Sequence, residues 1–163
     1  MDDKEKLKLE EEIEELEAVK GRHTELVTVM IPAGFNMHPV LKQLEAEKST
    51  AANIKSKQTR TAVIESLEKI IRELRAIGKT PTNGIALFAG NVSKKEGDSE
   101  IGFWAIEPPK PLKTRMYRCD KEFILEPLIE MTEVTEVFGL LVMDRKEATI
   151  GILEGKSVEV LGI

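Results

Sequence analysis

One long segment of this chain has the pattern of an amphipathic helix, and it limits the folds that the rest can adopt. Six aliphatic residues recur at helical spacing along one side, and Gly78 follows them as a candidate C-cap: Val63, Leu67, Ile70, Ile71, Leu74 and Ile77. The segments on either side, ELVTVMI at 25–31 and GIALFAG at 84–90, have the composition of buried strands. Such a helix must bury its apolar side against another element. The pattern therefore predicts an α+β domain.

Shorter patterns complete this domain, which we place at residues 1–135. Helices are predicted at 4–20, at 39 to about 47 and over 123–131, and a hairpin is predicted at 84–107. The segment TRMYRC at 114–119 alternates like a further strand, with Tyr117 and Cys119 on one face. We expect a mostly antiparallel four-stranded sheet layered with helices.

Residues 136–163 differ in kind from the rest. Three strand-like segments, VFGLLVM, EATIGIL and SVEVL, are joined by the short turns DRK and EGK, and no helical pattern follows them. A β-meander of this length is marginal by itself and exposes strand edges that pair with other chains. We expect it to be the first strands of a second, incomplete domain and a region of self-association.

Composition sets the class of protein. The 163 residues are 41% hydrophobic, which is enough for one core. No apolar run approaches the roughly 18 residues that span a bilayer, and the N-terminus is charged. A single cysteine, Cys119, excludes an internal disulfide, and with only His23 and His38 it gives no zinc ligand set. We expect a cytoplasmic protein without a membrane segment, metal or cofactor.

Charge is unevenly distributed along the chain. Residues 1–17 hold nine acidic side chains against three basic ones, whereas residues 55–79 hold seven basic against three acidic ones. A further basic cluster lies at 110–121. The central segments could therefore contact RNA although the net charge is −5. A solvated charged face explains the same pattern.

The segment TAANIKS, residues 50–56, leads into the long helix. Asn53 and Ser56 both suit a helix N-cap, where a side-chain oxygen accepts a backbone N–H. Lys55 does not, because the helix dipole makes this end partly positive. The lysine therefore has another role or is an accident.

Two short motifs together resemble one family. Asn53-Ile54-Lys55-Ser56 and Tyr117-x-Cys119-x-x-x-Phe123 match in full the motifs of the N-terminal domain of eukaryotic and archaeal class I peptide chain release factors. Thr50-Ala51, PTNGIALFAG and the run FGLLVMD…GILEG are also similar, so the resemblance extends from about Leu7 to the end of the chain. The archaeal members are the closer likeness.

The resemblance implies a function in translation termination. In the family this domain recognises stop codons in the ribosomal decoding site, and a later domain with a Gly-Gly-Gln motif promotes hydrolysis of peptidyl-tRNA. None of the eleven glycines here is adjacent to another, and the only glutamines are Gln43 and Gln58. We expect a recognition module that is not an enzyme. Its implied partners are small-subunit rRNA, the mRNA stop codon and an elongation-factor-like GTPase, the last contacted mainly outside this chain.

The resemblance also implies roles for single residues. Asn53 and Lys55 would inspect the first uridine, with Lys55 suited to uracil O4. Ile54 would hold the loop against the core, and Ser56 would steady its helical end. Thr50 precedes the loop, and Ala52 occupies a position that is often serine in eukaryotic members.

A second group of residues would face the purines of the codon. Glu47 could accept a hydrogen bond from an adenine amino group. Tyr117 would supply a ring and a hydroxyl, Cys119 a small and weakly polar neighbour, and Phe123 packing support. Thr24 fits a third family element before the first strand, where His23 replaces the usual glycine. We expect the loop to be exposed at the tip of two helices, with Tyr117 and Cys119 nearby.

Two other hypotheses stay open at this point. A ribosome-rescue factor of the Pelota type has a related later architecture, but it is not expected to carry NIKS or YxCxxxF. From another class, the chain could be a protein-interaction module that binds an acidic partner through the basic helix at 56–79.

Overall fold

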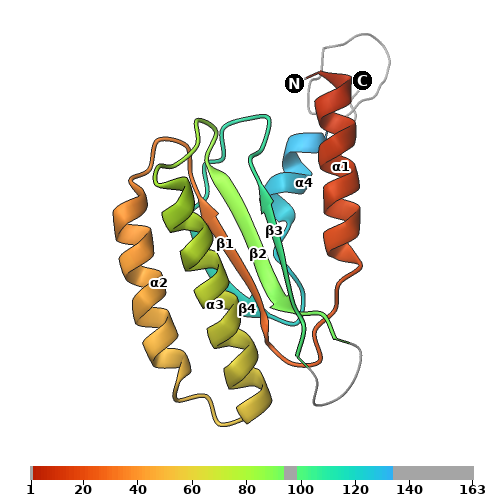
Figure 1. Cartoon of the computed structure of the whole chain (residues 1–163). Coiled ribbons are helices and arrows are strands. Elements are labelled where there is room, and N and C mark those ends of the chain that lie inside the picture. The colour runs from red at the N-terminus through yellow and green to blue at the C-terminus, as the bar shows by residue number, and fades with distance from the viewer. Residues whose placement is uncertain (1, 94–98, 134–163) are drawn as a thin grey trace, which may run out of the picture. The chain divides into compact units, whose positions relative to one another are not determined.

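The structure is a computed structural model, and it describes residues 2–93 and 99–133 (Figure 1). The elements in chain order are α1 (Asp3–Glu17), β1 (Leu26–Ile31), α2 (Met37–Ala51), α3 (Lys57–Ile77), β2 (Ile85–Asn91), β3 (Ile101–Ile106), β4 (Met116–Asp120) and α4 (Glu126–Thr132). The chain divides into two compact units, Met1–Leu128 and Ile129–Ile163. The β-meander predicted at 136–163 lies outside the described residues.

The four strands form one sheet in the order β3-β2-β1-β4. Each neighbouring pair is antiparallel. Strand β1 lies inside the sheet, and its Leu26 is opposite Gly90 of β2 on one side and Asp120 of β4 on the other. Every residue of β1 and β2 is buried, as expected for central strands covered on both faces. The predicted α+β class and the antiparallel four-stranded sheet are confirmed.

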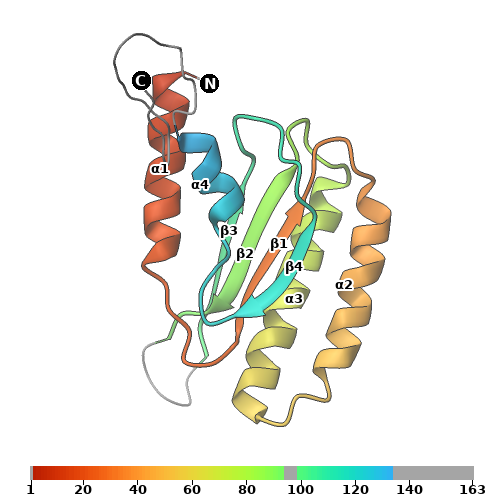
Figure 2. The ribbon, with the colours of Figure 1, turned by 180° about the vertical axis from the view of Figure 1, so that it is seen from behind.

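Helices cover both faces of the sheet (Figures 1 and 2). On the first face, α2 and α3 bury their apolar sides against alternate strand residues such as Val27, Val29 and Leu87. On the second face, the ring of Phe88 meets that of Phe123 edge to face, and Glu15 of α1 accepts a hydrogen bond from the indole of Trp104. The α2–α3 pair and α1 therefore lie on opposite sides of the sheet.

Helix α2 is longer than predicted at both ends. Asn36 is its N-cap, since the Asn36 side chain accepts from the backbone N–H of His38 at 3.0 Å. The helix begins at Met37, so Pro39 does not start it but lies within its first turn. A proline is tolerated there because the first-turn backbone N–H groups make no helical bonds. At the other end, Thr50 and Ala51 belong to the helix and not to the loop.

Two other boundaries differ from the sequence prediction. Helix α1 ends at Glu17 rather than near residue 20; Ala18 is its C-cap, and Val19 lies beyond the helix. Helix α4 begins at Glu126, so Phe123 and Leu125 precede it. Both of these side chains are buried, so their helix-like spacing reflects burial of the segment that leads into α4.

Gly84 offers a test of the turn before β2. Its φ is +81°, and a Cβ at this position would collide with the backbone oxygen of Ile31. Gly34 has a φ of +77° but no atom within 4 Å of the same position. We expect Gly84→Ala to lower the free energy of unfolding by about 2–4 kcal/mol, and Gly34→Ala by only about 1 kcal/mol. Equal losses in urea denaturation would contradict the collision.

Candidate RNA-recognition site

The loop that carries the NIKS motif lies at one end of the α2–α3 pair (Figure 1). The last turn of α2 tightens into i→i+3 bonds: the N–H of Asn53 donates to Thr50 at 3.0 Å, and that of Ile54 donates to Ala51 at 3.0 Å. Residues 52–56 then reverse the chain into α3. The predicted loop at the tip of two helices is observed.

Ser56, and not Asn53, is the N-cap of α3. Its hydroxyl accepts from the backbone N–H of Thr59 at 3.3 Å. Ile54 is half-buried and packs on the core beneath α2 and α3. Asn53 is exposed and is left available for a contact outside the molecule.

Arg60 is a residue of this site that the sequence analysis missed. Its guanidinium donates to the backbone oxygen of Ile54 at 2.9 Å, a charge-assisted bond from the first turn of α3 back to the loop. Its backbone N–H also donates to Ser56 at 2.8 Å. Arg60 therefore fixes the main chain between Asn53 and Lys55. The only signal in the sequence was a basic residue one helical turn after the cap, which a solvated helix face also shows.

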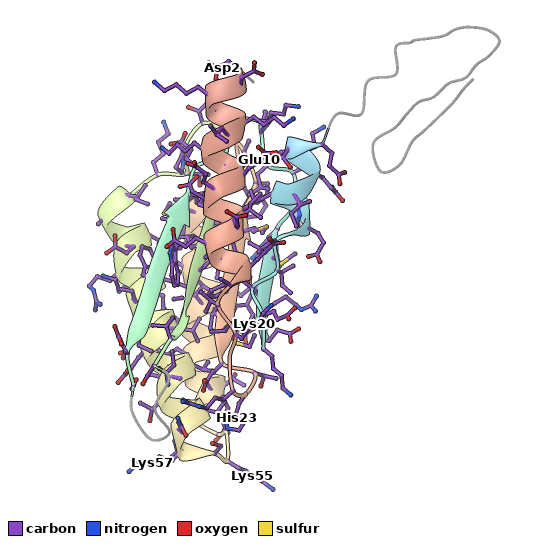
Figure 3. The ribbon with its side chains drawn as sticks, turned by 90° about the vertical axis from the view of Figure 1, so that its right-hand side faces the viewer. Asp2, Glu10, Lys20, His23, Lys55 and Lys57 are labelled. Carbon is purple, nitrogen blue, oxygen red and sulfur yellow. The ribbon has the colours of Figure 1, made fainter. Side chains whose placement is uncertain are left out.

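Lys55 points away from the molecule (Figure 3). Its side chain is exposed, and none of the hydrogen bonds or ion pairs among the described residues involves it. Lys57 and His23 lie at the same end of the molecule (Figure 3). The lysine that a cap does not explain is thus a solvent-facing cation on a loop held from behind by Arg60 and Ile54.

Tyr117 and Cys119 lie side by side on β4 and pack against the first face of the core. The Tyr117 hydroxyl and the Cys119 sulfur are 3.1 Å apart and share a hydrogen bond. Both side chains are half-buried. The predicted common face of these two residues is observed.

Burial and the Glu47 carboxylate keep this pair neutral. The pKa of Tyr117 is raised well above its usual range by burial first, then by the hydrogen bond to Cys119 and by the charges of Cys119 and Glu47. Burial also raises the pKa of Cys119, and so does the charge of Glu47, while the hydrogen bond from Tyr117 acts in the opposite direction. At neutral pH the pair offers a hydroxyl and a thiol beside a carboxylate of α2, which is a set of donors and acceptors suited to base edges.

Of the remaining predicted site residues, two are on the surface and one is in the core. Thr24 is exposed in the bend before β1, next to His23 at the loop end of the molecule. Thr50 is exposed in the last turn of α2. Phe123 is only 5% exposed and contacts Phe88 and Trp104, with ring centroids 5.4 and 5.6 Å apart, on the opposite face of the sheet from Tyr117. The structure therefore separates Phe123 from the other site residues.

The basic helix α3 is partly neutralised along its length. Lys69 pairs with Glu73 at 3.3 Å, and Arg75 pairs with Glu45 of α2 at 2.6 Å. Exposed pairs of this kind contribute little to stability, but they reduce the charge that α3 offers to a partner. The accessible positive charge near the NIKS loop comes from the exposed Lys55 and Lys57.

The described parts of the chain offer neither a metal-binding cluster nor a membrane-spanning helix. No group of three or more His, Cys, Asp or Glu side chains there could hold a metal ion. None of the helices described is long and apolar enough to cross a membrane.

Comparison with known proteins gives the family. The protein-family model described as eRF1 domain 1 matches residues 4–133, and the chain therefore belongs to this family. It is 52% identical to the peptide chain release factor subunit 1 of Thermococcus onnurineus over 94% of this chain, and 51% identical to that of Pyrococcus abyssi over the same share. The chain spans 37% of the length of each of these two relatives.

Two solved structures have a fold similar to that of this chain. A crystal structure described as archaeal translation termination factor aRF1 is similar with a TM-score of 0.70 and 34% identity, over 78% of this chain and 35% of that one. A second structure, titled only as an archaeal protein, has a TM-score of 0.72 and 33% identity over 78% of this chain and 36% of that one. The fold and the family are therefore those that the two sequence motifs indicated.

Proposed function

We propose that this chain recognises stop codons during translation termination, as the N-terminal part of a longer release factor. The observation that carries the proposal is the NIKS loop: Lys55 is exposed, and the main chain behind it is fixed by the 2.9 Å bond from Arg60 to Ile54. A cation held in this way is suited to the O4 and O2 acceptors of an unpaired uracil. The match to release factor relatives supports the same function.

The two parts of the site, the NIKS loop and the group around Tyr117, would contact different bases of the codon. Lys55 and Asn53 at the loop would inspect the first uridine. Glu47, Tyr117 and Cys119 would face the two purines, since the neutral hydroxyl and thiol and the carboxylate can pair with amino and carbonyl groups of bases. His23 lies at the same end of the molecule as Lys55 (Figure 3), and Thr24 follows it in the chain; both would border the codon, as would Thr50.

In this proposal residues 1–135 form the recognition domain, and residues 136–163 open the domain that follows. The chain itself is not an enzyme, and peptidyl-tRNA hydrolysis would depend on a domain absent from it. Its partners would be the small-subunit rRNA and the mRNA stop codon, with a translational GTPase contacted mainly by other parts of the factor. Its place would be the cytoplasm, where ribosomes translate.

The energetics of so few contacts predict that the ribosome must present the codon. Base contacts of about 1–3 kcal/mol each scarcely offset an association cost of about 4–15 kcal/mol. We expect no measurable binding of this chain to a free UAA trinucleotide by titration calorimetry, and measurable binding to ribosomes with UAA in the decoding site. Tight and selective binding to the free trinucleotide, or equal binding to ribosomes with UAA and with a sense codon, would contradict the proposal.

A further inference from the structure

A groove lies at the end of the α2–α3 pair away from the NIKS loop. It has a volume of about 500 Å³ and is lined by residues from the start of α2 and the end of α3. One wall is the segment from Gly34 to His38, and the other runs from Leu74 to Thr80. Codon recognition as proposed above uses none of these residues.

The floor of the groove is aliphatic and already in place. Met37 and Leu74 are buried in the core, and Leu41 packs against it while lining the groove. Ile77, which precedes Gly78 of the groove, is 42% exposed and adds apolar surface beside it. An apolar side chain from a partner would be buried here on contact with Leu41.

The walls are tied together and need little rearrangement. The Thr80 hydroxyl donates to the backbone oxygen of Phe35 at 2.6 Å, joining one wall to the other. Gly78 ends α3 in the left-handed conformation, with a φ of +77°, and its N–H donates to Leu74 at 2.9 Å. A preformed groove costs a ligand less conformational entropy than a mobile one.

The charged side chains that line the groove are basic. They are Arg75 and Lys79, and no acidic side chain lines it among the residues described. Arg75 is paired with Glu45, but the structure gives Lys79 no ion pair within its described ranges. Arg115 adds a further cation beside the groove, with its guanidinium 4.9 Å from the centroid of the Phe35 ring. This arrangement is complementary to an acidic partner with an apolar anchor.

Nucleic acid fits the groove less well than a peptide does. Unpaired bases bind by stacking on exposed aromatic faces. The groove is lined by one phenyl ring, that of Phe35, which Arg115 already covers, and by the imidazole of His38. The aliphatic floor instead matches the way that peptide segments anchor leucine or similar side chains in a groove.

We propose that this groove is a docking site for an acidic protein segment that inserts an aliphatic side chain between α2 and α3, next to Lys79. The segment would place a carboxylate on Lys79 and its aliphatic side chain on Leu41. This site is separate from the NIKS loop, so a partner could be held there while the loop contacts RNA. A substitution of Lys55 therefore leaves binding of the acidic segment unchanged.

Titration of the 163-residue chain followed by amide NMR tests the proposal. The probe is a synthetic peptide of alternating Asp, Glu and Leu, and the control probe has Lys and Arg in place of its acids. We expect the acidic peptide to shift the amides of Gly34, Gly78 and Lys79 saturably. Lys79→Glu should weaken binding about fivefold. Lys4→Glu, which changes the net charge equally at an exposed position of α1, should change binding less than about twofold.

Four outcomes would overturn the docking site. They are an acidic peptide that moves no amide of the groove, equal binding of the charge-reversed peptide, equal effects of the two lysine substitutions, or tighter binding of a single-stranded uridine oligonucleotide at the same amides. Lys79 is exposed, so its substitution is not expected to unfold the domain. The unchanged dispersion of the remaining amide resonances verifies this.

Discussion

Phe123→Ala is expected to lower the free energy of unfolding by about 3–5 kcal/mol, the loss seen when a buried aromatic side chain is truncated in a well-packed core. The Phe123 ring is 5% exposed and meets Phe88 and Trp104 edge to face. The segment that carries it is tied to the sheet, because the N–H of Ile124 donates to the Thr28 hydroxyl at 3.0 Å. The cavity left by the ring therefore has little freedom to collapse. Urea denaturation measures the loss.

Phe103→Ala is the matched control for this prediction. The Phe103 ring lies on the other face of the sheet, is only half-buried, and has the Lys69 ammonium 5.4 Å from its centroid. We expect Phe103→Ala to lower the free energy of unfolding by less than half as much as Phe123→Ala does. If Phe123→Ala unfolds with the same midpoint as the unaltered chain but no longer binds UAA-programmed ribosomes, Phe123 contacts the codon and its assignment to the core is wrong.

Lys55→Ala in a full-length release factor should reduce the rate of stop-codon-dependent peptide release by about ten- to a hundredfold, the equivalent of one good base contact of about 1–3 kcal/mol. The fold should be unaffected, because Lys55 is exposed and the structure assigns it no contact within its described ranges. The helix dipole gives a small effect of opposite sign, since removing a cation before α3 stabilises the helix slightly. Peptide release from UAA-programmed ribosomes measures the loss of activity, and circular dichroism checks that the fold is unaffected.

Lys57→Ala is the control for general electrostatics. Lys57 is also exposed, at the first residue of α3 and at the same end of the molecule (Figure 3). If phosphate attraction alone explained the role of Lys55, the two variants would lose activity equally and the loss would shrink with added salt. We expect Lys57→Ala to lose less than about threefold, which is the range of a single exposed charge contact.

The sheet and the long helix could be predicted from sequence because burial leaves a local signature. Strands β1 and β2 are covered on both faces and therefore appear as nearly continuous apolar runs, interrupted by Thr28 in β1. Helix α3 has one buried side and ends at the predicted C-cap Gly78; the observed Lys57–Ile77 lies within the predicted range 56–79. Where a boundary depended on a single residue type, as at Pro39, the prediction was wrong.

The site could be predicted only in part. The two motifs point to the loop and to β4, and the two-residue spacing of Tyr117 and Cys119 on a strand gives them a common face. The Arg60 bond to Ile54 and the separation of Phe123 could not be predicted, because both depend on how distant segments pack. Phe123 lies four residues after Cys119, yet the chain leaves β4 in between and turns to the other face of the sheet.

The most direct measurement of codon recognition is a double-mutant cycle between Lys55 and the first base of the codon. Binding of the unaltered chain and of Lys55→Ala would be compared on ribosomes with UAA and with CAA in the decoding site. If Lys55 contacts the first uridine, the preference for UAA should fall in the variant, with a coupling free energy of about 1–3 kcal/mol. If the variant binds both ribosomes more weakly by the same factor, the coupling is zero and Lys55 does not recognise the base.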